Sequence, residues 1–141
     1  MKLFFKSKNK NVEKFKIFVY GTLKEGCALH NYLRDSKLIS KTHFVRGTLY
    51  ALSRGFPAVV LEKNGKVFGE VYEVNLDVLQ SLDYMELSEG YERKLVKLDD
   101  GTEAWIYHIE FDKIKLIADK FCVIEDGIWR NFGGDFYAQM L

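Results

Sequence analysis

The sequence predicts an α+β fold in which a small mixed sheet, mostly antiparallel and barrel-like, carries helices at its periphery. Strand-like runs follow one another across short turns, without the helical crossovers that a parallel sheet requires. One strongly periodic helix interrupts them in the middle of the chain. With 141 residues, the chain is long enough for a single domain with its own hydrophobic core.

The chain begins with a basic segment. Residues 1–16 contain six lysines and one glutamate, and residues 6–14 have no apolar periodicity, so they are a frayed lead-in or a linker to an added strand at Leu3–Phe5. We therefore expect a basic extension over residues 1–14 and one folded domain over residues 15–141. Such a basic segment can contact nucleic acid or an acidic surface, but lysine-rich termini are more often only solvated, so the role of this extension stays open.

Strands dominate the first half of the predicted domain. The β-branched and aromatic run Phe15–Tyr20 predicts a buried strand that ends where Gly21 permits a turn. A short amphipathic helix is expected over residues 27–34. Three further strands follow, with Asn64-Gly65 indicating a hairpin between the last two: Thr42–Leu52, Ala58–Leu61 and Val67–Val74.

The second half contains the periodic helix. Asn75 can cap a helix whose apolar positions recur at three-residue steps from Leu76 to Met85, and which ends before Gly90. The elements after it are a strand, a turn, a second strand, a closing helix and an irregular tail: Tyr91–Leu98, Asp99-Asp100-Gly101, Thr102–Phe111, residues 113–122 and the chain from Glu125.

Charge and hydropathy exclude several classes of protein. The net charge of +1 argues against a protein that mainly neutralises nucleic-acid phosphates. The longest apolar stretches have four residues, whereas a membrane helix needs about 20 and a secretion signal about 7–15. Two cysteines suit a reducing compartment. We therefore expect a cytoplasmic protein without nucleic-acid or membrane partners.

Motifs for the common cofactors are absent from the sequence. It has no phosphate-binding loop, dinucleotide-binding glycine motif, zinc-binding helix motif or nucleophile elbow. The three histidines lie on different predicted elements, so neither a metal nor a cofactor is expected. Cys27 and His30 lie at helical spacing and could form a reactive thiolate, but a small buried cysteine is the simpler interpretation.

The segment after the first predicted strand is a candidate binding loop. Tyr20, Gly21, Thr22 and Leu23 follow this strand directly, and a glycine there lets the backbone approach a ligand closely. Successive free N–H groups in such a loop can hold a carboxylate or an oxyanion. From spacing alone, an ordinary turn between a strand and a helix is the stronger interpretation.

A carboxylate near the end of the periodic helix is a candidate general acid or base. Glu86 lies four residues after Leu82, at the edge of the apolar stripe, so it should be half-buried. Burial and the negative end of the helix dipole both raise the pKa of a carboxyl, as a base working near neutral pH requires. The alternative is an ordinary helix-terminal acid that pairs with a lysine or Arg93.

Taken together, these segments resemble the γ-glutamylcyclotransferase-like family, in particular the branch of γ-glutamylamine cyclotransferase and the plant avirulence-induced (AIG2-like) proteins. The resemblance runs from about Phe15 to Arg130. It is carried by these landmarks in order: Phe18-Val19-Tyr20-Gly21-Thr22-Leu23-Lys24 with Gly26, His30-Asn31 and Leu33, Gly47-Thr48-Leu49-Tyr50, Pro57-Ala58, Val67-Phe68-Gly69-Glu70-Val71-Tyr72, Leu82-Asp83 with Glu86, Tyr91 and Arg93, and the weaker Trp105-Ile106-Tyr107 and Gly127-Ile128-Trp129.

The resemblance implies a cofactor-independent enzyme that releases 5-oxoproline from a small γ-glutamyl amine or peptide. It implies that residues 20–23 hold the γ-glutamyl group through backbone amides and that Glu86 is the acid/base. In the family this acid is commonly followed by glycine. Here Glu86 is followed by Leu87, whereas Glu89 is followed by Gly90, so Glu89 is the reserve candidate. The leaving group should meet the loops Ser53–Pro57 and Ser88–Tyr91.

Two other functions stay open. One is a binding or interaction module that keeps the pocket without catalysis. The other is a different lyase or amide-cleaving reaction in the same pocket, because one fold hosts many chemistries. Tyr107 could line the pocket, although an aromatic residue in a strand more often belongs to the core.

Overall fold

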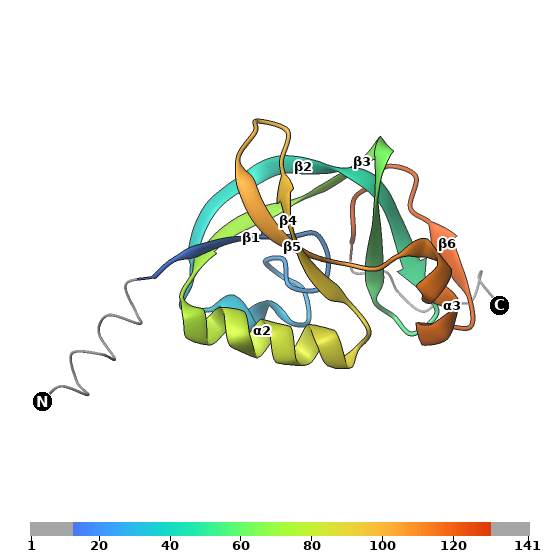
Figure 1. The fold of residues 1–141 in the computed structure, drawn as a ribbon, viewed down its shortest axis with the longest axis horizontal. Helices are drawn as coiled ribbons and strands as arrows, with labels where there is room; N and C mark the ends of the chain where they lie inside the picture. Colours follow the sequence, from blue (N-terminus) through green and yellow to red (C-terminus); the bar gives the residue numbers. More distant parts are fainter. Residues whose placement is uncertain (1–12, 131–141) are drawn as a thin grey trace, which may run out of the picture.

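The computed structural model describes residues 13–130, so the expected extension over residues 1–14 lies outside the described part except for its last two residues (Figure 1). The elements are β1 (Phe15–Val19), a 3₁₀ turn (His30–Leu33), β2 (Lys37–Leu52), β3 (Pro57–Val74), α2 (Leu76–Ser88), β4 (Glu92–Lys97), β5 (Glu103–His108), a 3₁₀ turn (Phe111–Lys113), α3 (Ile114–Ile117) and β6 (Phe121–Val123). The longest helix within residues 13–130 is α2 with 13 residues, and none there has the length and apolar character of a membrane span.

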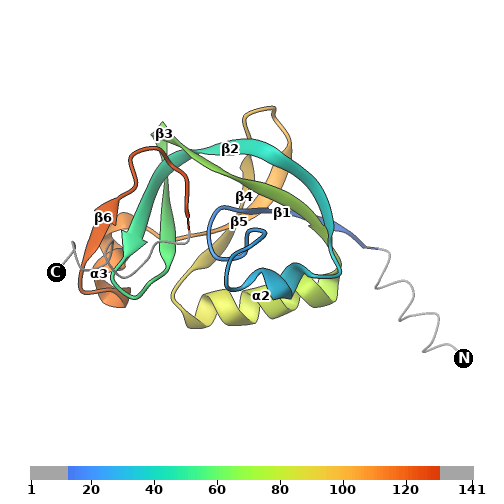
Figure 2. The same cartoon turned by 180° about the vertical axis from the view of Figure 1, so that it is seen from behind.

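The strands form one curled, mixed sheet in the order β4-β5-β1-β3-β2-β6. Only β1 and β5 pair in parallel, with Ile17 opposite Trp105, and the other pairs are antiparallel. Figures 1 and 2 show the sheet curling over, with α2 lying across its open side. The predicted α+β architecture with a mostly antiparallel, barrel-like sheet is therefore confirmed.

The predicted hairpin at Asn64-Gly65 is wrong. Both flanking segments belong to β3 and pair with β2: Val67 lies opposite Val45, and Leu61 lies opposite Gly47. Residues 62–65 are extra residues at a break in this register. Gly65 has φ +80°, and a side chain there would place its Cβ 2.4 Å from the Gly47 carbonyl oxygen. The turn signal therefore marks a corner in one long strand.

The helix predictions had mixed outcomes. Helix α2 is confirmed, and the side chain of Asn75 caps it by accepting a hydrogen bond from Val78 N at 2.9 Å. The helix expected over residues 27–34 shrinks to a 3₁₀ turn at His30–Leu33. The closing helix expected over residues 113–122 ends at Ile117, because the following segment pairs with the end of β2 as strand β6.

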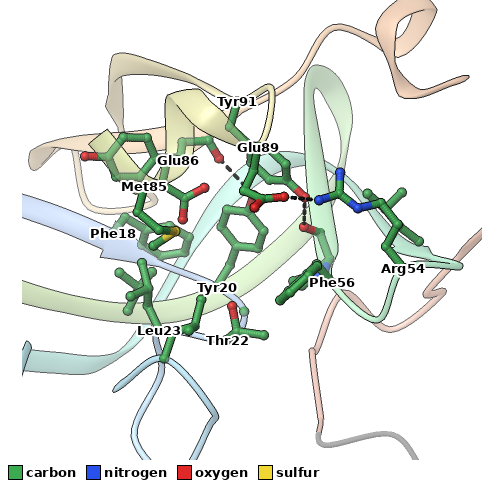
Figure 3. Close-up of a pocket in the computed structure, with 16 residues that line it drawn as sticks. Phe18, Tyr20, Thr22, Leu23, Arg54, Phe56, Met85, Glu86, Glu89 and Tyr91 are labelled. Atoms are coloured by element: carbon green, nitrogen blue, oxygen red, sulfur yellow. Dashed lines mark hydrogen bonds and ion pairs between the residues drawn. The ribbon is translucent and has the colours of Figure 1, made fainter. Parts of the chain in front are cut away.

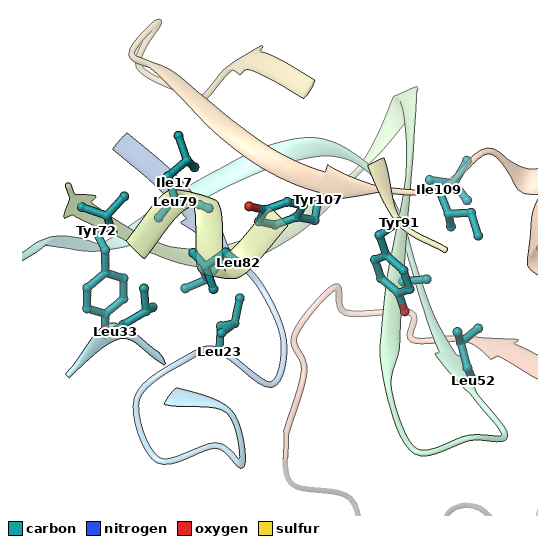
Figure 4. Packing of buried hydrophobic residues seen from close by; sticks show 14 of the residues in the cluster. Ile17, Leu23, Leu33, Leu52, Tyr72, Leu79, Leu82, Tyr91, Tyr107 and Ile109 are labelled. Atoms are coloured by element: carbon teal, nitrogen blue, oxygen red, sulfur yellow. The ribbon is translucent and has the colours of Figure 1, made fainter. Parts of the chain in front are cut away.

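Strand β1 is buried on both faces, and this fixes the position of the loop that follows it. Ile17 and Val19 belong to the core between the sheet and α2, part of which is shown in Figure 4. Phe18 and Tyr20 belong to a second core on the opposite face. Successive side chains of a strand point to opposite faces. Residues 20–23 therefore follow a strand whose end is buried on both faces and which is paired on both edges.

Candidate active site

A pocket of about 160 Å³ lies at the end of β1 (Figure 3). Three segments far apart in the sequence form most of its wall: the loop after β1, the loop between β2 and β3, and the end of α2. The pocket is lined by Phe18, Val19, Tyr20, Gly21, Thr22, Leu23, Leu29, Leu52, Arg54, Phe56, Pro57, Met85, Glu86, Glu89, Tyr91 and Tyr107. The lining includes Glu86 and residues 20–23, which the sequence predicts as site residues, together with residues of both loops expected to meet the leaving group.

The loop after β1 is held by close packing. A Cβ atom on Gly21 would lie 2.2 Å from Cγ of Pro57, so only glycine fits at this position without a shift of the loop. The Gly21 carbonyl accepts a hydrogen bond from Lys24 N, and the Thr22 carbonyl accepts one from Leu29 N. Within residues 13–130, the amides of residues 21–23 have no hydrogen-bond acceptor. Because the three residues line the pocket, their successive N–H groups are candidate donors to a ligand.

Glu86 lies half-buried on α2, one turn after the fully buried Leu82. Loss of water around its carboxyl raises its pKa from 4.5 to about 7. The described residues offer this carboxylate neither an ion pair nor a hydrogen bond. Arg93, the alternative partner considered from the sequence, pairs with Asp83 at 2.9 Å instead. The position predicted from the apolar stripe is confirmed, and the catalytic role of Glu86 stays a prediction.

Glu89, the reserve candidate, is in a different environment. It follows the last residue of α2, and its side chain is 40% exposed. Its carboxylate forms an ion pair with Arg54 of the β2–β3 loop. The two carboxylates line the same pocket, but Glu89 is ion-paired with Arg54, whereas Glu86 is unpaired within residues 13–130 and burial raises its pKa to about 7. This difference favours Glu86 as the proton carrier.

Three buried tyrosines order the wall around Glu86. Tyr20 donates its hydroxyl proton to the Tyr107 carbonyl at 2.8 Å, and Tyr91 donates to the Pro57 carbonyl at 2.6 Å. The Tyr107 hydroxyl donates to Asp83 Oδ1 at 2.7 Å. Burial raises the pKa of all three tyrosines, and the charge of Glu86 raises it further. They are therefore neutral at physiological pH, and each hydroxyl proton is donated to an acceptor within the protein.

Tyr107 combines both roles considered from the sequence, since its side chain is buried in the core and also lines the pocket. The sequence gives no individual signal that Arg54, Phe56 and Met85 line the pocket. No motif marks them, because their place in the lining depends on how the β2–β3 loop and α2, which are distant in the sequence, come together.

The burial of Glu86 predicts that stability falls as pH rises from about 4.5 to about 7. The folded protein keeps this proton up to about pH 7, whereas the unfolded chain loses it near pH 4.5. The unfolded state is therefore favoured progressively across this window, by at most about 3 kcal/mol. Urea unfolding at several pH values checks this, with Glu86→Gln as the control that lacks the titrating group. If the difference in free energy of unfolding between the two proteins stayed constant from pH 4.5 to 7, this prediction would be contradicted.

Cys27 does not have the environment of a nucleophile. Partial burial raises the pKa of its thiol above the ordinary value, whereas a reactive cysteine needs a lowered pKa. His30 binds the Leu23 carbonyl through Nδ1 at 2.9 Å. His30 therefore supports the loop after β1, whereas Cys27 is half-buried against the second core, less deeply than the simpler interpretation expects.

One group of side chains in residues 13–130 has the spacing of metal ligands. Ligand atoms of His43, Asp99 and Asp100 lie within 4.8 Å of one another, outside the pocket. Asp99 Oδ1 accepts hydrogen bonds from His43 Nδ1 at 2.9 Å and from Phe44 N at 3.0 Å. Asp100 Oδ1 accepts one from Thr102 N at 2.9 Å. These bonds already give the group a structural role in the β4–β5 turn.

Comparison with known proteins identifies the family. A family model described as gamma-glutamyl cyclotransferase, AIG2-like, matches residues 17–131. The gamma-L-glutamyl-butirosin B gamma-glutamyl cyclotransferase of Niallia circulans is 40% identical over 70 residues, which are 50% of this chain and 44% of that protein. The present chain thus matches less than half the length of this relative.

Other relatives match over more of their length. The gamma-glutamylcyclotransferase family protein YtfP of Escherichia coli K12 is 32% identical over 119 residues, which are 82% of this chain and 96% of that protein. The crystal structure of an AIG2-like protein from Mus musculus superposes with a TM-score of 0.62 at 26% identity, over 68% of this chain and 77% of that one. The family model, the relatives and the fold agree, and the chain belongs to the γ-glutamyl cyclotransferase, AIG2-like family.

Proposed function

We propose that this chain is an enzyme that releases 5-oxoproline from a small γ-glutamyl amine or peptide. One observation carries the proposal: the buried carboxyl of Glu86 lines the same pocket as the loop amides without acceptors in residues 13–130. The name of the Niallia circulans relative supports the reaction class, since that protein is a cyclotransferase for a γ-glutamyl compound.

The reaction is an internal cyclisation of the γ-glutamyl unit. Its α-amine nitrogen attacks its own γ-carbonyl carbon, and a bond forms between these two atoms. The bond from this carbon to the leaving nitrogen then breaks, and one proton moves from the attacking nitrogen to the leaving nitrogen. The atoms balance without water or another reactant. Because both reacting groups belong to one molecule, a pocket that holds the substrate folded supplies much of the acceleration.

In this mechanism Glu86 carries the proton. An α-amine is mostly protonated near neutral pH and must lose a proton before it can attack. A carboxyl with a pKa of about 7 is partly ionised at that pH, so it can accept this proton and later donate it to the leaving nitrogen.

The amides of Gly21, Thr22 and Leu23 are proposed to stabilise negative charge on the substrate. As the amine attacks, the γ-carbonyl oxygen develops a negative charge that needs hydrogen-bond donors already in place. One such donor is typically worth about 2.7–4 kcal/mol. The same row of amides also suits the α-carboxylate of the γ-glutamyl unit.

A product assay tests the proposal. The purified full chain is incubated with γ-glutamyl dipeptides, γ-glutamyl amines and glutathione, and 5-oxoproline is followed by mass spectrometry against samples without protein. We expect protein-dependent 5-oxoproline from at least one substrate. Free glutamate in its place would indicate amide hydrolysis. A raised unfolding temperature without any product would indicate a binding module.

A further inference from the structure

An ion pair on the pocket wall suggests how the leaving group is recognised. Arg54 of the β2–β3 loop and Glu89 at the end of α2 both line the pocket, and they pair with each other. In Figure 3 the guanidinium of Arg54 is turned toward Glu89, beside Phe56. The two side chains are 35% and 40% exposed, whereas Glu86 is more deeply placed. The pair therefore lies on the solvent side of the proposed reaction centre.

The guanidinium of Arg54 has more N–H donors than its hydrogen bonds within residues 13–130 use. A guanidinium has five N–H groups in a fixed, planar arrangement. One bond from Nη1 reaches the Ile117 carbonyl at 3.1 Å, and one from Nη2 reaches Glu89. No other acceptor in residues 13–130 receives a hydrogen bond from Arg54, which leaves three N–H groups for a ligand. These two bonds also fix the guanidinium, so a ligand would meet a donor group that is already oriented.

The charged side chains of the pocket favour one sign of charge on the leaving group. Three charged side chains are in the lining: Arg54, Glu86 and Glu89. A carboxylate on the leaving group can use the remaining donors of Arg54 without breaking an existing bond. A cationic leaving group would be repelled by the Arg54 guanidinium, and it could reach Glu89 only by sharing that carboxylate with Arg54. The arrangement therefore favours a negatively charged leaving group.

We propose that Arg54 binds a carboxylate of the leaving group, so that γ-glutamyl amino acids and peptides are preferred over γ-glutamyl derivatives of simple amines. This inference rests on the proposed cyclotransferase function and names the substrate class for that same pocket. It makes Arg54 a specificity-determining residue, while the proton transfer stays with Glu86.

Two matched substrates isolate the carboxylate. γ-Glutamyl-alanine and γ-glutamyl-ethylamide release alanine and ethylamine, which differ only by one carboxylate. We expect the parent protein to show a higher kcat/KM for γ-glutamyl-alanine. In Arg54→Gln, the ratio of the two kcat/KM values should fall by at least about tenfold, mainly through a higher KM for γ-glutamyl-alanine, because a hydrogen-bonded charge contact is lost.

Two further variants separate recognition from folding. Arg54→Lys keeps the charge but not the planar donors, so its ratio should lie between those of the parent and Arg54→Gln. Arg46 is the matched control, because it lies outside the pocket lining and stacks over Phe44 at 5.3 Å, as Arg54 stacks over Phe56 at 5.9 Å. Arg46→Gln should leave the ratio unchanged. Because the ratio is taken within each variant, a loss of folded protein cancels.

The outcomes distinguish this inference from the proposed function. A ratio that stays within threefold of the parent value in Arg54→Gln, while both substrates still give 5-oxoproline, overturns the role of Arg54 and leaves the proposed function intact. A parent protein that prefers the ethylamide also overturns it. If the parent releases no 5-oxoproline from any substrate, the proposed function fails and this inference fails with it.

Discussion

Replacing Glu86 with glutamine is expected to lower kcat/KM for 5-oxoproline release by at least about 10²-fold, the usual contribution of a general acid or base. Glutamine keeps the size of the side chain but cannot carry the proton, so binding of the γ-glutamyl unit should be much less affected. The matched control is Glu89→Gln, which changes the other carboxylate in the pocket lining. Glu89→Gln should lower kcat/KM for 5-oxoproline release by less than about tenfold.

Two readouts make this test specific to proton transfer. The kcat/KM of the parent should rise with pH up to about pH 7, where Glu86 becomes ionised, and Glu86→Gln should lose this dependence. The variant should also be at least as stable as the parent at pH 7, because it no longer buries an ionisable group. If Glu89→Gln showed the larger loss of rate, the reserve candidate would be the acid/base.

The second large effect is expected from Gly21→Ala. The added Cβ would lie 2.2 Å from Cγ of Pro57, so the loop must move or the protein must unfold. Overpacking of this kind typically costs about 1–3 kcal/mol of stability. A displacement of about 1 Å in a group that positions substrate can cost about 10²-fold in rate. We expect both losses, measured by chemical unfolding and by 5-oxoproline release.

A double-mutant cycle tests the stated cause. Pro57→Ala removes the atom that the new Cβ would meet, and it keeps the Pro57 carbonyl that accepts the Tyr91 hydroxyl. Gly21→Ala should therefore cost less stability in the Pro57→Ala background than in the parent, by about 0.5–3 kcal/mol. Equal costs in both backgrounds would show that contact with Pro57 is not what requires glycine at this position.

Local patterns predicted the elements whose partners are close in the sequence. The cap at Asn75, the apolar stripe of α2 and the turn at Asp99-Asp100-Gly101 are local signals, and the structure contains all three features. The Asn64-Gly65 signal is equally local, but the partner of both flanking segments is β2, which lies earlier in the chain. Pairing with the preceding strand overrode the local turn preference, and a single sequence does not show the register of such pairing.

The same limit applies to the pocket. The half-buried position of Glu86 follows from helical periodicity alone, since Leu82 lies four residues before it on the buried stripe. The ion pair between Arg54 and Glu89 joins residues 35 positions apart, and no motif connects them. The close contact of Gly21 with Pro57 is likewise a product of the folded chain. The expected proton carrier could thus be derived from the sequence, whereas the details of the surrounding wall could not.

The parallel pairing of β1 with β5 has a consequence for the synthesis of this protein. Tyr20, at the start of the binding loop, is hydrogen-bonded to Tyr107, 87 positions later. Most of the domain must therefore emerge from the ribosome before β1, which precedes this loop, can pair with β5 as its second neighbour. Contacts so distant in sequence form slowly, because a long loop must close first. The pocket is therefore expected to be among the last parts of the molecule to form, and nascent chains that end before β5 should not bind substrate.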